Sequence, residues 1–323
     1  MNFATIGTSW ITESFIDSSK YIDDVYIYAV YSRSEEKAKA FAEKNNVEKY
    51  YSSLEKMLGD ENIDAVYVAS PNSKHYEQAK MCLEAGKHVI CEKPMVVTSE
   101  QLRELYDIAD SKNLILLEAM KSMHSDGLGI IKNSLEKIGD FRTASIDFSQ
   151  HSSKYASYKR GENPNIFNPE FCTGALMDLG VYCVYFALEL FGEPDKVIAH
   201  SDFLESGADY TGTLIFVYDK LTVTITYSKV ANGFTGSRIL GEKGAILVKS
   251  VSKLIGIDCV LNDGTKENLY PEIDENEVMS KEIAAFINFI NGRNTEYYDY
   301  CKKMAFASCR IIENIRKENN FVF

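Results

Sequence analysis

Short apolar runs alternate with segments of helical periodicity through the first 120 residues. Apolar runs bounded by turn residues predict buried strands, and apolar positions three or four residues apart predict amphipathic helices. Ser73 is the expected N-cap of one helix and Gly86 the expected residue after its end. The expected strands are residues 3–6, 25–31, 63–69, 89–91 and 114–117, and the expected helices are residues 12–19, 37–44, 73–86 and 99–112. These strand–helix–strand units predict a parallel sheet covered by helices on both faces.

The pattern changes after about residue 122, where strand-like segments predominate. Residues 222–228 alternate between hydroxyl and apolar side chains, so the second sheet should have one face against helices and one that is solvated or faces a partner subunit. The expected strands are residues 141–148, 196–203, 211–218, 221–227, 237–240, 245–248, 254–261 and 267–270, and the expected helices are residues 173–191, 277–291 and 297–317. This half therefore reads as an α+β domain on a large, mostly antiparallel open sheet.

Charge and cysteine content narrow the class of protein. The chain of 323 residues has a formal net charge of −12, which argues against nucleic acid and against an anionic membrane as partners. Its seven cysteines form no C-x-x-C pair, so neither a zinc site nor a disulfide framework is indicated, and buried free thiols in a reducing cytoplasm are expected. We see no signal peptide and no apolar run long enough to span a bilayer, and we expect no metal site.

The turn after the first strand carries a partial dinucleotide signal. The fingerprint G-x-G-x-x-G/A belongs at this place, and Gly7 matches its first position, whereas Ser9 and Thr12 replace the other two. The N–H groups at the start of the following helix would still attract a phosphate. A plain strand–helix turn containing a glycine is the alternative. The turn comprises Gly7, Thr8, Ser9, Trp10, Ile11 and Thr12.

The end of the second strand bears on the choice of cofactor. Ser32 lies twenty residues after Thr12, where an enzyme that uses NAD usually has an acidic residue for the ribose. Here Arg33 follows, with Lys37 nearby, and a guanidinium suits a 2′-phosphate. We therefore expect NADP(H) to be preferred, with NAD(H) possible. The alternative is that Arg33 is a solvated loop residue.

A lysine stands directly after the strand at residues 89–91. Glu92, Lys93 and Pro94 follow that strand, which places an ammonium at the carboxyl end of a parallel strand, where open α/β sheets bind ligands. Pro94 restricts the backbone there. Lys93 could then donate to a substrate oxygen and stabilise negative charge on it. A solvated lysine at the end of a surface strand is the alternative.

Two blocks of sequence make the chain similar to the Gfo/Idh/MocA family of nicotinamide-dependent oxidoreductases. The first block comprises residues 70–75, 84–89, 92–94 and 118–120, and the second comprises residues 168–170 and 173–182. The second resembles the family motif G-G-A-L-x-D-x-G-x-[HY]. Because its last position is Tyr182, the chain resembles the glucose–fructose oxidoreductase and dimeric dihydrodiol dehydrogenase group. The resemblance implies an α/β fold with a Rossmann dinucleotide-binding domain, residues 1–120, and an α+β domain for substrate binding and oligomerisation, residues 121–323.

The resemblance also implies roles for individual residues. Lys93 would contact the reacting hydroxyl or carbonyl, Glu92 would help to hold the site, and Asp178 would bind or orient the substrate. Tyr182 would act as the acid/base, and its spacing from Asp178 places both on one helix face. A nearby Lys93 ammonium would lower the pKa of the phenol. A core tyrosine beside Cys183 is the alternative.

The residues expected to contact the cofactor are shared between the turn and the family positions. They are Gly7, Thr8, Ser9, Trp10, Ile11, Ser32, Arg33, Ser70, Asn72, His75, Glu92 and Lys93. His75 could instead be a structural hydrogen-bonding residue, and Trp10 could cover the cofactor, line the substrate entrance or pack at a domain junction. Lys121 stands where the family commonly has an aromatic residue, which leaves the substrate open.

These observations predict an NADP(H)-preferring oxidoreductase that transfers a hydride between nicotinamide and a carbinol or carbonyl carbon of a sugar, polyol or vicinal diol. The alternative is an NAD(P)-binding regulatory or sensor protein without turnover. By analogy with the family, we expect a homodimer or higher homo-oligomer that forms through the open face of the second sheet.

Overall fold

The computed structural model describes residues 1–323, which form two compact units. The first unit comprises Met1–Met120 with Asp274–Lys303, and the second comprises Lys121–Ile273 with Met304–Phe323. Residues 274–303 thus pack with the first unit, although the sequence places them in the second domain. An amphipathic pattern shows that a helix has an apolar face, but it does not show which sheet that face covers.

The first unit is built on a six-stranded parallel sheet with the order β3-β2-β1-β4-β5-β6. The strands are β1 (Asn2–Ile6), β2 (Tyr26–Tyr31), β3 (Lys49–Tyr51), β4 (Ala65–Val68), β5 (His88–Glu92) and β6 (Leu116–Ala119). The order reverses between β1 and β4. This switch point is where doubly wound sheets bind ligands, at the carboxyl ends of the strands. The parallel sheet expected from the sequence is confirmed.

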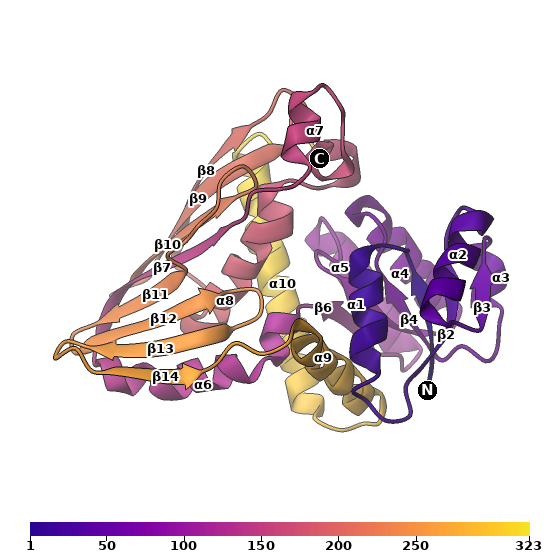
Figure 1. The fold of residues 1–323 in the computed structure, drawn as a ribbon, viewed down its shortest axis with the longest axis horizontal. Helices are drawn as coiled ribbons and strands as arrows, with labels where there is room; N and C mark the ends of the chain where they lie inside the picture. Colours follow the sequence, from indigo (N-terminus) through magenta and orange to yellow (C-terminus); the bar gives the residue numbers. More distant parts are fainter. The chain divides into compact units, whose positions relative to one another are not determined.

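Helices α1 and α9 pack together in the first unit, as Figure 1 shows. The ring of Phe3 in β1 lies 5.7 Å from that of Phe15 in α1 and 5.9 Å from that of Phe286 in α9. The unit's helices are α1 (Trp10–Ser19), α2 (Glu35–Asn45), α3 (Leu54–Leu58), α4 (His75–Glu84), α5 (Ser99–Ser111) and α9 (Glu275–Ile290). Strand β3 and helix α3 were not expected, because elements this short give no periodic signal.

The start of α4 differs from the expectation. A 3₁₀ turn, η1 (Asn72–Lys74), precedes the helix, so Lys74 and not Ser73 is its N-cap. Gly86 has φ = 77° and follows the last turn, as expected for a residue that ends a helix.

The second unit is built on an eight-stranded open sheet with the order β14-β13-β12-β11-β7-β10-β9-β8 (Figure 1). Only the pair β7/β10 is parallel. Val223, Ile225 and Tyr227 of β10 are fully buried, whereas Thr222 and Thr226 are exposed, which confirms two unlike faces. The strands are β7 (Phe141–Ser149), β8 (Lys196–Phe203), β9 (Asp209–Val217), β10 (Thr222–Ser228), β11 (Ser237–Gly241), β12 (Gly244–Ser250), β13 (Ile255–Leu261) and β14 (Lys266–Tyr270).

The expected helix 173–191 begins later and in a different form. Gly174 has φ = 134°, which no helix accommodates, so the helical stretch begins with the π-turn η6 (Leu176–Gly180) and continues as α8 (Val181–Phe191). The unit's other helical segments are η2 (Lys121–His124), α6 (Asp126–Ser134), η3 (Leu135–Ile138), α7 (Tyr155–Lys159), η4 (Asn165–Phe167), η5 (Pro169–Phe171) and the end of α10 (Thr295–Glu318).

The segment Pro169–Phe191, which runs from η5 through η6 to the end of α8, has the length and apolar composition that crossing a membrane requires, with a mean hydropathy of 1.6. This corrects the expectation that the chain has no such run. However, 78 % of its most apolar window is buried inside the protein, as in the core helix of a water-soluble fold. All seven cysteines are free thiols, and Cys82, Cys91 and Cys183 are among the buried ones.

Candidate active site

The turn between β1 and α1 is shaped for close approach of a ligand to the backbone. Gly7 has φ = 119°, and a Cβ there would collide with the carbonyl oxygen of Ala69 at the end of β4. Thr12 is fully buried beneath this turn, and its hydroxyl has no hydrogen-bond partner. A glycine is therefore required by geometry, as the first fingerprint position demands.

The amino end of α1 is open to an anion. Ser9 is the N-cap, and its carbonyl accepts from the N–H groups of Thr12 and Glu13 at 3.1 and 3.2 Å, while its side chain makes no capping hydrogen bond. Ser9 and Trp10 are exposed, Trp10 at 67 %, and Thr8 and Ile11 are half-buried. This arrangement fits the pyrophosphate of a dinucleotide, because a helix start offers N–H donors and a partial positive charge.

The loop after β2 presents a cation. The N–H of Ser32 donates to the carbonyl of Tyr51 at 3.1 Å, and the side chain of Ser34 caps α2 by accepting from the N–H of Lys37. Arg33 stands between these two anchored residues and is exposed. The loop therefore holds a guanidinium where the ribose of a dinucleotide is bound in this fold.

His75 joins the loops that follow β4 and β5. Its Nε2 lies 2.7 Å from the carbonyl oxygen of Ser70, and its Nδ1 lies 2.9 Å from that of Pro94. Burial lowers the pKa of His75, although the two carbonyls act in the opposite direction. This is the structural role considered for His75, and direct contact with a cofactor stays a prediction. Asn72 begins η1 in the same loop and is half-buried.

Two carboxylates brace the segment that carries Lys93. Glu92 accepts a hydrogen bond of 2.6 Å from the hydroxyl of Tyr67, and Glu118 accepts one of 2.9 Å from the N–H of Met95. The peptide bond between Lys93 and Pro94 is cis. Lys93, which is half-buried, thus extends from a loop anchored on both sides. Its ordered position agrees with a role at the carboxyl ends of the strands.

In the second unit, Asp178 and Tyr182 lie on the consecutive elements η6 and α8. Asp178 belongs to the π-turn and Tyr182 to the first turn of α8, and π-turns are frequent at functional sites. The side chain of Asp178 is 32 % exposed, whereas Tyr182 is 8 % exposed and packs edge-on against Phe148. Because Gly180 has no side chain, the turn can lie close to the ring of Tyr227 in β10.

Two residues that the sequence did not single out complete this arrangement. Lys229 forms an ion pair with Asp178, and the carboxylate of Asp209 accepts from the N–H of Leu176 at 2.7 Å. A lysine or aspartate at the end of a strand is too common a pattern to indicate such a contact. The contacts of Lys229 and Asp209 with η6 are evident only from the structure, in which the start of β9 and the end of β10 lie beside η6.

The structure thus places the candidate residues in two groups. Gly7, Ser32, Ser70, Glu92 and Lys93 lie at the carboxyl ends of strands in the first unit, and Asp178 and Tyr182 lie on η6 and α8 in the second. That Lys93 and Tyr182 act on the same substrate stays a prediction. The doubly wound sheet with its glycine turn, joined to a second unit on an open sheet, defines the class of two-part, dinucleotide-binding proteins.

Comparison with known families agrees with this class. The model described as the oxidoreductase family with an NAD-binding Rossmann fold matches residues 1–120, and that of the GFO/IDH/MocA C-terminal domain matches residues 134–247. The chain belongs to the Gfo/Idh/MocA oxidoreductase family. It is therefore an oxidoreductase with an NAD-binding Rossmann domain, as the sequence predicts.

Individual relatives agree over most of the chain. The scyllo-inositol 2-dehydrogenase (NADP(+)) IolU of Bacillus subtilis is 36 % identical over 323 residues, which are 100 % of this chain and 98 % of the relative. A trans-1,2-dihydrobenzene-1,2-diol dehydrogenase of Xenopus laevis is 34 % identical over 70 % of this chain and 68 % of its own. The 3-ketoreductase KijD10 of Actinomadura kijaniata, solved with NADP and TDP-benzene, has a TM-score of 0.84 over 98 % of this chain and 97 % of its own. At 19 % identity, that structure supports the fold alone.

Proposed function

We propose that this protein is an NADP(H)-preferring dehydrogenase or reductase that transfers a hydride between nicotinamide and a carbinol or carbonyl carbon of a polyol, sugar or vicinal diol. The observation that carries the proposal is the position of Asp178 on η6 and of Tyr182 in the first turn of α8, in a chain that aligns over its full length with a scyllo-inositol 2-dehydrogenase. The named diol dehydrogenases among its relatives support the same class of substrate.

The preference for NADP(H) rests on the loop after β2. A carboxylate at the position of Ser32 would accept from the ribose hydroxyls of NAD and repel a 2′-phosphate. Ser32 carries no charge, and the exposed guanidinium of Arg33 can form two parallel hydrogen bonds to phosphate. The pyrophosphate would be held by the turn at Gly7 and the start of α1.

The protein's own residues supply orientation and proton transfer. The bound cofactor supplies or accepts the hydride. Asp178 would accept a hydrogen bond from a substrate hydroxyl, Lys93 would donate to the reacting oxygen, and Tyr182 would take or give the proton at that oxygen. Tyr182 is shielded from bulk water, which favours a directed proton transfer.

The proposal is tested by turnover with each cofactor. Purified protein is assayed for reduction of NADP⁺ and NAD⁺ with scyllo-inositol, other inositols, aldoses and a trans-dihydrodiol, and the affinities of NADPH and NADH are titrated by fluorescence. Arg33→Ala should weaken NADPH by about 10-fold and leave NADH unchanged, whereas Arg142→Ala, at an exposed arginine of the second unit, should change neither. Tight cofactor binding without turnover on the whole panel would favour a sensor instead.

We also propose self-association through the open face of the second sheet. Ile198 of β8 and Leu240 of β11 are 46 % and 39 % exposed, and they contribute apolar surface to that face. Light scattering of the wild type and of Ile198→Lys tests this. A monomeric wild type would exclude it.

A further inference from the structure

Two ionisable side chains lie buried at one end of the β9–β10 hairpin. Asp209 is the first residue of β9, and Lys229 directly follows the last residue of β10. The N–H of Lys229 donates to the carbonyl of Tyr210 at 2.8 Å, which holds the two strand ends side by side. Asp209 is fully buried and the side chain of Lys229 is 7 % exposed. Ionisable groups are rarely buried to this extent unless each has a partner.

Both side chains bind η6. Asp209 anchors the start of the turn through the N–H of Leu176, and a Cβ on Gly174 would collide with its carboxylate. Lys229 pairs with Asp178. One oxygen of Asp178 therefore meets a buried ammonium while its side chain, at 32 % exposed, still reaches solvent.

The carboxyl group of Asp209 resists ionisation. Burial raises the pKa of Asp209 to about 7, although the N–H of Leu176 and the charge of Lys229 act in the opposite direction. The second oxygen of Asp209 has no hydrogen-bond partner. The carboxylate that forms an ion pair with the Lys229 ammonium is that of Asp178.

We infer that Lys229 is a positioning residue: its buried ammonium pairs with the Asp178 carboxylate and fixes its orientation toward a substrate hydroxyl. The inference rests on the proposed function. A carboxylate that already has a buried cation accepts hydrogen bonds without requiring a cationic ligand, so this arrangement favours a neutral polyol. Removal of the ammonium would remove the ion pair that orients the Asp178 carboxylate.

Lys229→Met tests the inference by kinetics. The variant should lower kcat/KM for the polyol at least about 10-fold, mainly through a higher KM, because a substrate contact is misplaced. The affinity for NADPH should not change. Lys229→Arg should restore most of the lost activity, since it retains the charge. Lys229→Gln should resemble Lys229→Met, and it takes the place of that variant if Lys229→Met does not fold.

A second buried lysine provides a matched control. Lys87 in the first unit is 8 % exposed, and its Nζ donates to the carbonyls of Asp60 and Ile63 at 3.0 and 2.8 Å. Lys87→Met should lower the melting temperature as Lys229→Met does, yet leave KM and kcat within about twofold of wild type. Equal kinetic losses in both variants would mean that Lys229 acts only on stability.

A double-mutant cycle with Asp178→Asn separates the inference from the proposed function. The double variant should be no worse in kcat/KM than Asp178→Asn alone, and the two melting-temperature shifts should not add, since each substitution removes the same ion pair. Additive shifts would overturn the inference whether or not any polyol is oxidised. If the melting-temperature shifts are coupled but the wild type oxidises no polyol or diol, the proposed function is wrong. The inferred role of Lys229 toward the substrate is then wrong with it.

Discussion

The hydroxyl of Tyr67 donates a 2.6 Å hydrogen bond to the Glu92 carboxylate, which joins β4 to the residue before Lys93. The ring of Tyr67 stacks on Phe15 of α1 with centroids 3.9 Å apart. Helix α1, β4 and the end of β5 are thus linked through one fully buried tyrosine. The link connects the helix that follows the turn at Gly7 with the loop that carries the candidate catalytic lysine.

Tyr67→Phe should remove this link and keep the packing. We expect a loss of about 1–2 kcal/mol in the free energy of unfolding, because the Glu92 carboxylate loses a buried donor. We also expect a fall in kcat that is smaller than for Lys93→Ala. Urea unfolding and steady-state kinetics measure the two effects. Tyr26→Phe, at a tyrosine 59 % exposed, should change neither.

Tyr182→Phe and Lys93→Ala should each lower kcat by about 10² or more, since each removes a group proposed to act on the reacting oxygen. The affinity for NADP(H), measured by fluorescence titration, should change little. Tyr218→Phe, which removes a hydroxyl that donates to the carbonyl of Gly192, serves as the matched control. Near-normal turnover in both active-site variants would refute the assignment.

Gly7→Ala should abolish cofactor binding. The new Cβ would require both an unfavourable φ of 119° and displacement of the Ala69 carbonyl. Gly86→Ala separates these causes, because Gly86 also has a positive φ, 77°, but its Cβ would meet nothing within 4 Å. That variant should lose about 1–2 kcal/mol of stability and bind NADPH normally. Equal affinities in the two variants would show that the close approach at Gly7 is not needed.

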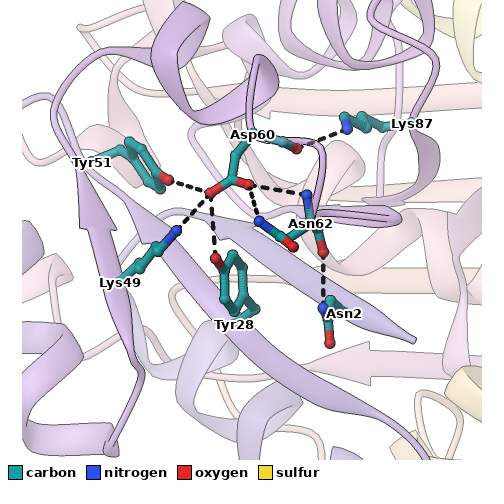
Figure 2. A network of polar contacts seen from close by, with 7 residues as sticks. All are labelled: Asn2, Tyr28, Lys49, Tyr51, Asp60, Asn62 and Lys87. Atoms are coloured by element: carbon teal, nitrogen blue, oxygen red, sulfur yellow. Dashed lines mark hydrogen bonds and ion pairs between the residues drawn. The ribbon is translucent and has the colours of Figure 1, made fainter.

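Asp60→Asn should destabilise the first unit in a pH-dependent way. The Asp60 carboxylate accepts hydrogen bonds of 2.7 Å from Tyr51 and 3.0 Å from Lys49. Figure 2 shows both contacts. These hydrogen bonds lower the pKa of the Asp60 carboxyl group, and the bond from Tyr51 has the largest effect. A lowered folded-state pKa means that the stabilisation is complete above the ordinary carboxyl range and is lost as the pH falls below it.

At pH 7 we expect Asp60→Asn to cost about 1–3 kcal/mol in unfolding free energy. The difference from wild type should shrink toward pH 3. Glu61→Gln, at the exposed neighbouring acid, should show no such dependence. A cost that is the same at both pH values would mean that the charge of Asp60 contributes nothing.

Asp209→Asn should change the pH dependence of stability in the opposite sense. The folded-state pKa is raised to about 7, so the native state holds a proton that the unfolded chain has released, and the stability contributed by Asp209 falls as the pH rises from about 4 to about 7. Asparagine keeps an acceptor for the N–H of Leu176 and does not ionise. The unfolding free energy of the variant, relative to wild type, should therefore rise over this window, while that of Asp219→Asn, at an exposed aspartate, should not change relative to wild type.

Local patterns predict much of this fold, because strands and helices of ordinary length have a regular spacing of apolar residues, such as Phe3, Phe15 and Ile225. The π-turn at Asp178 could not be foreseen, since it follows from the conformation of Gly174 and the approach of Gly180 to Tyr227. Motif resemblance found the residues expected to meet substrate and cofactor.

The partners of those residues were not found in the same way. Lys229 is 51 positions from Asp178, and Tyr67 is 25 from Glu92. Contacts of this kind depend on strand order and register, which short-range periodicity does not encode.

The packing of Phe286 against Phe3 has a consequence for synthesis on the ribosome. A nascent chain that ends at Met120 holds all six strands of its parallel sheet and Phe15, yet Phe286, the second aromatic ring against Phe3, lies more than 150 residues further along the chain. The first unit can therefore complete its packing only after residues 274–303 have been synthesised. A gene fragment ending at codon 120 should accordingly yield sticky, aggregating material, and joining it by a short linker to residues 274–303 should rescue its solubility.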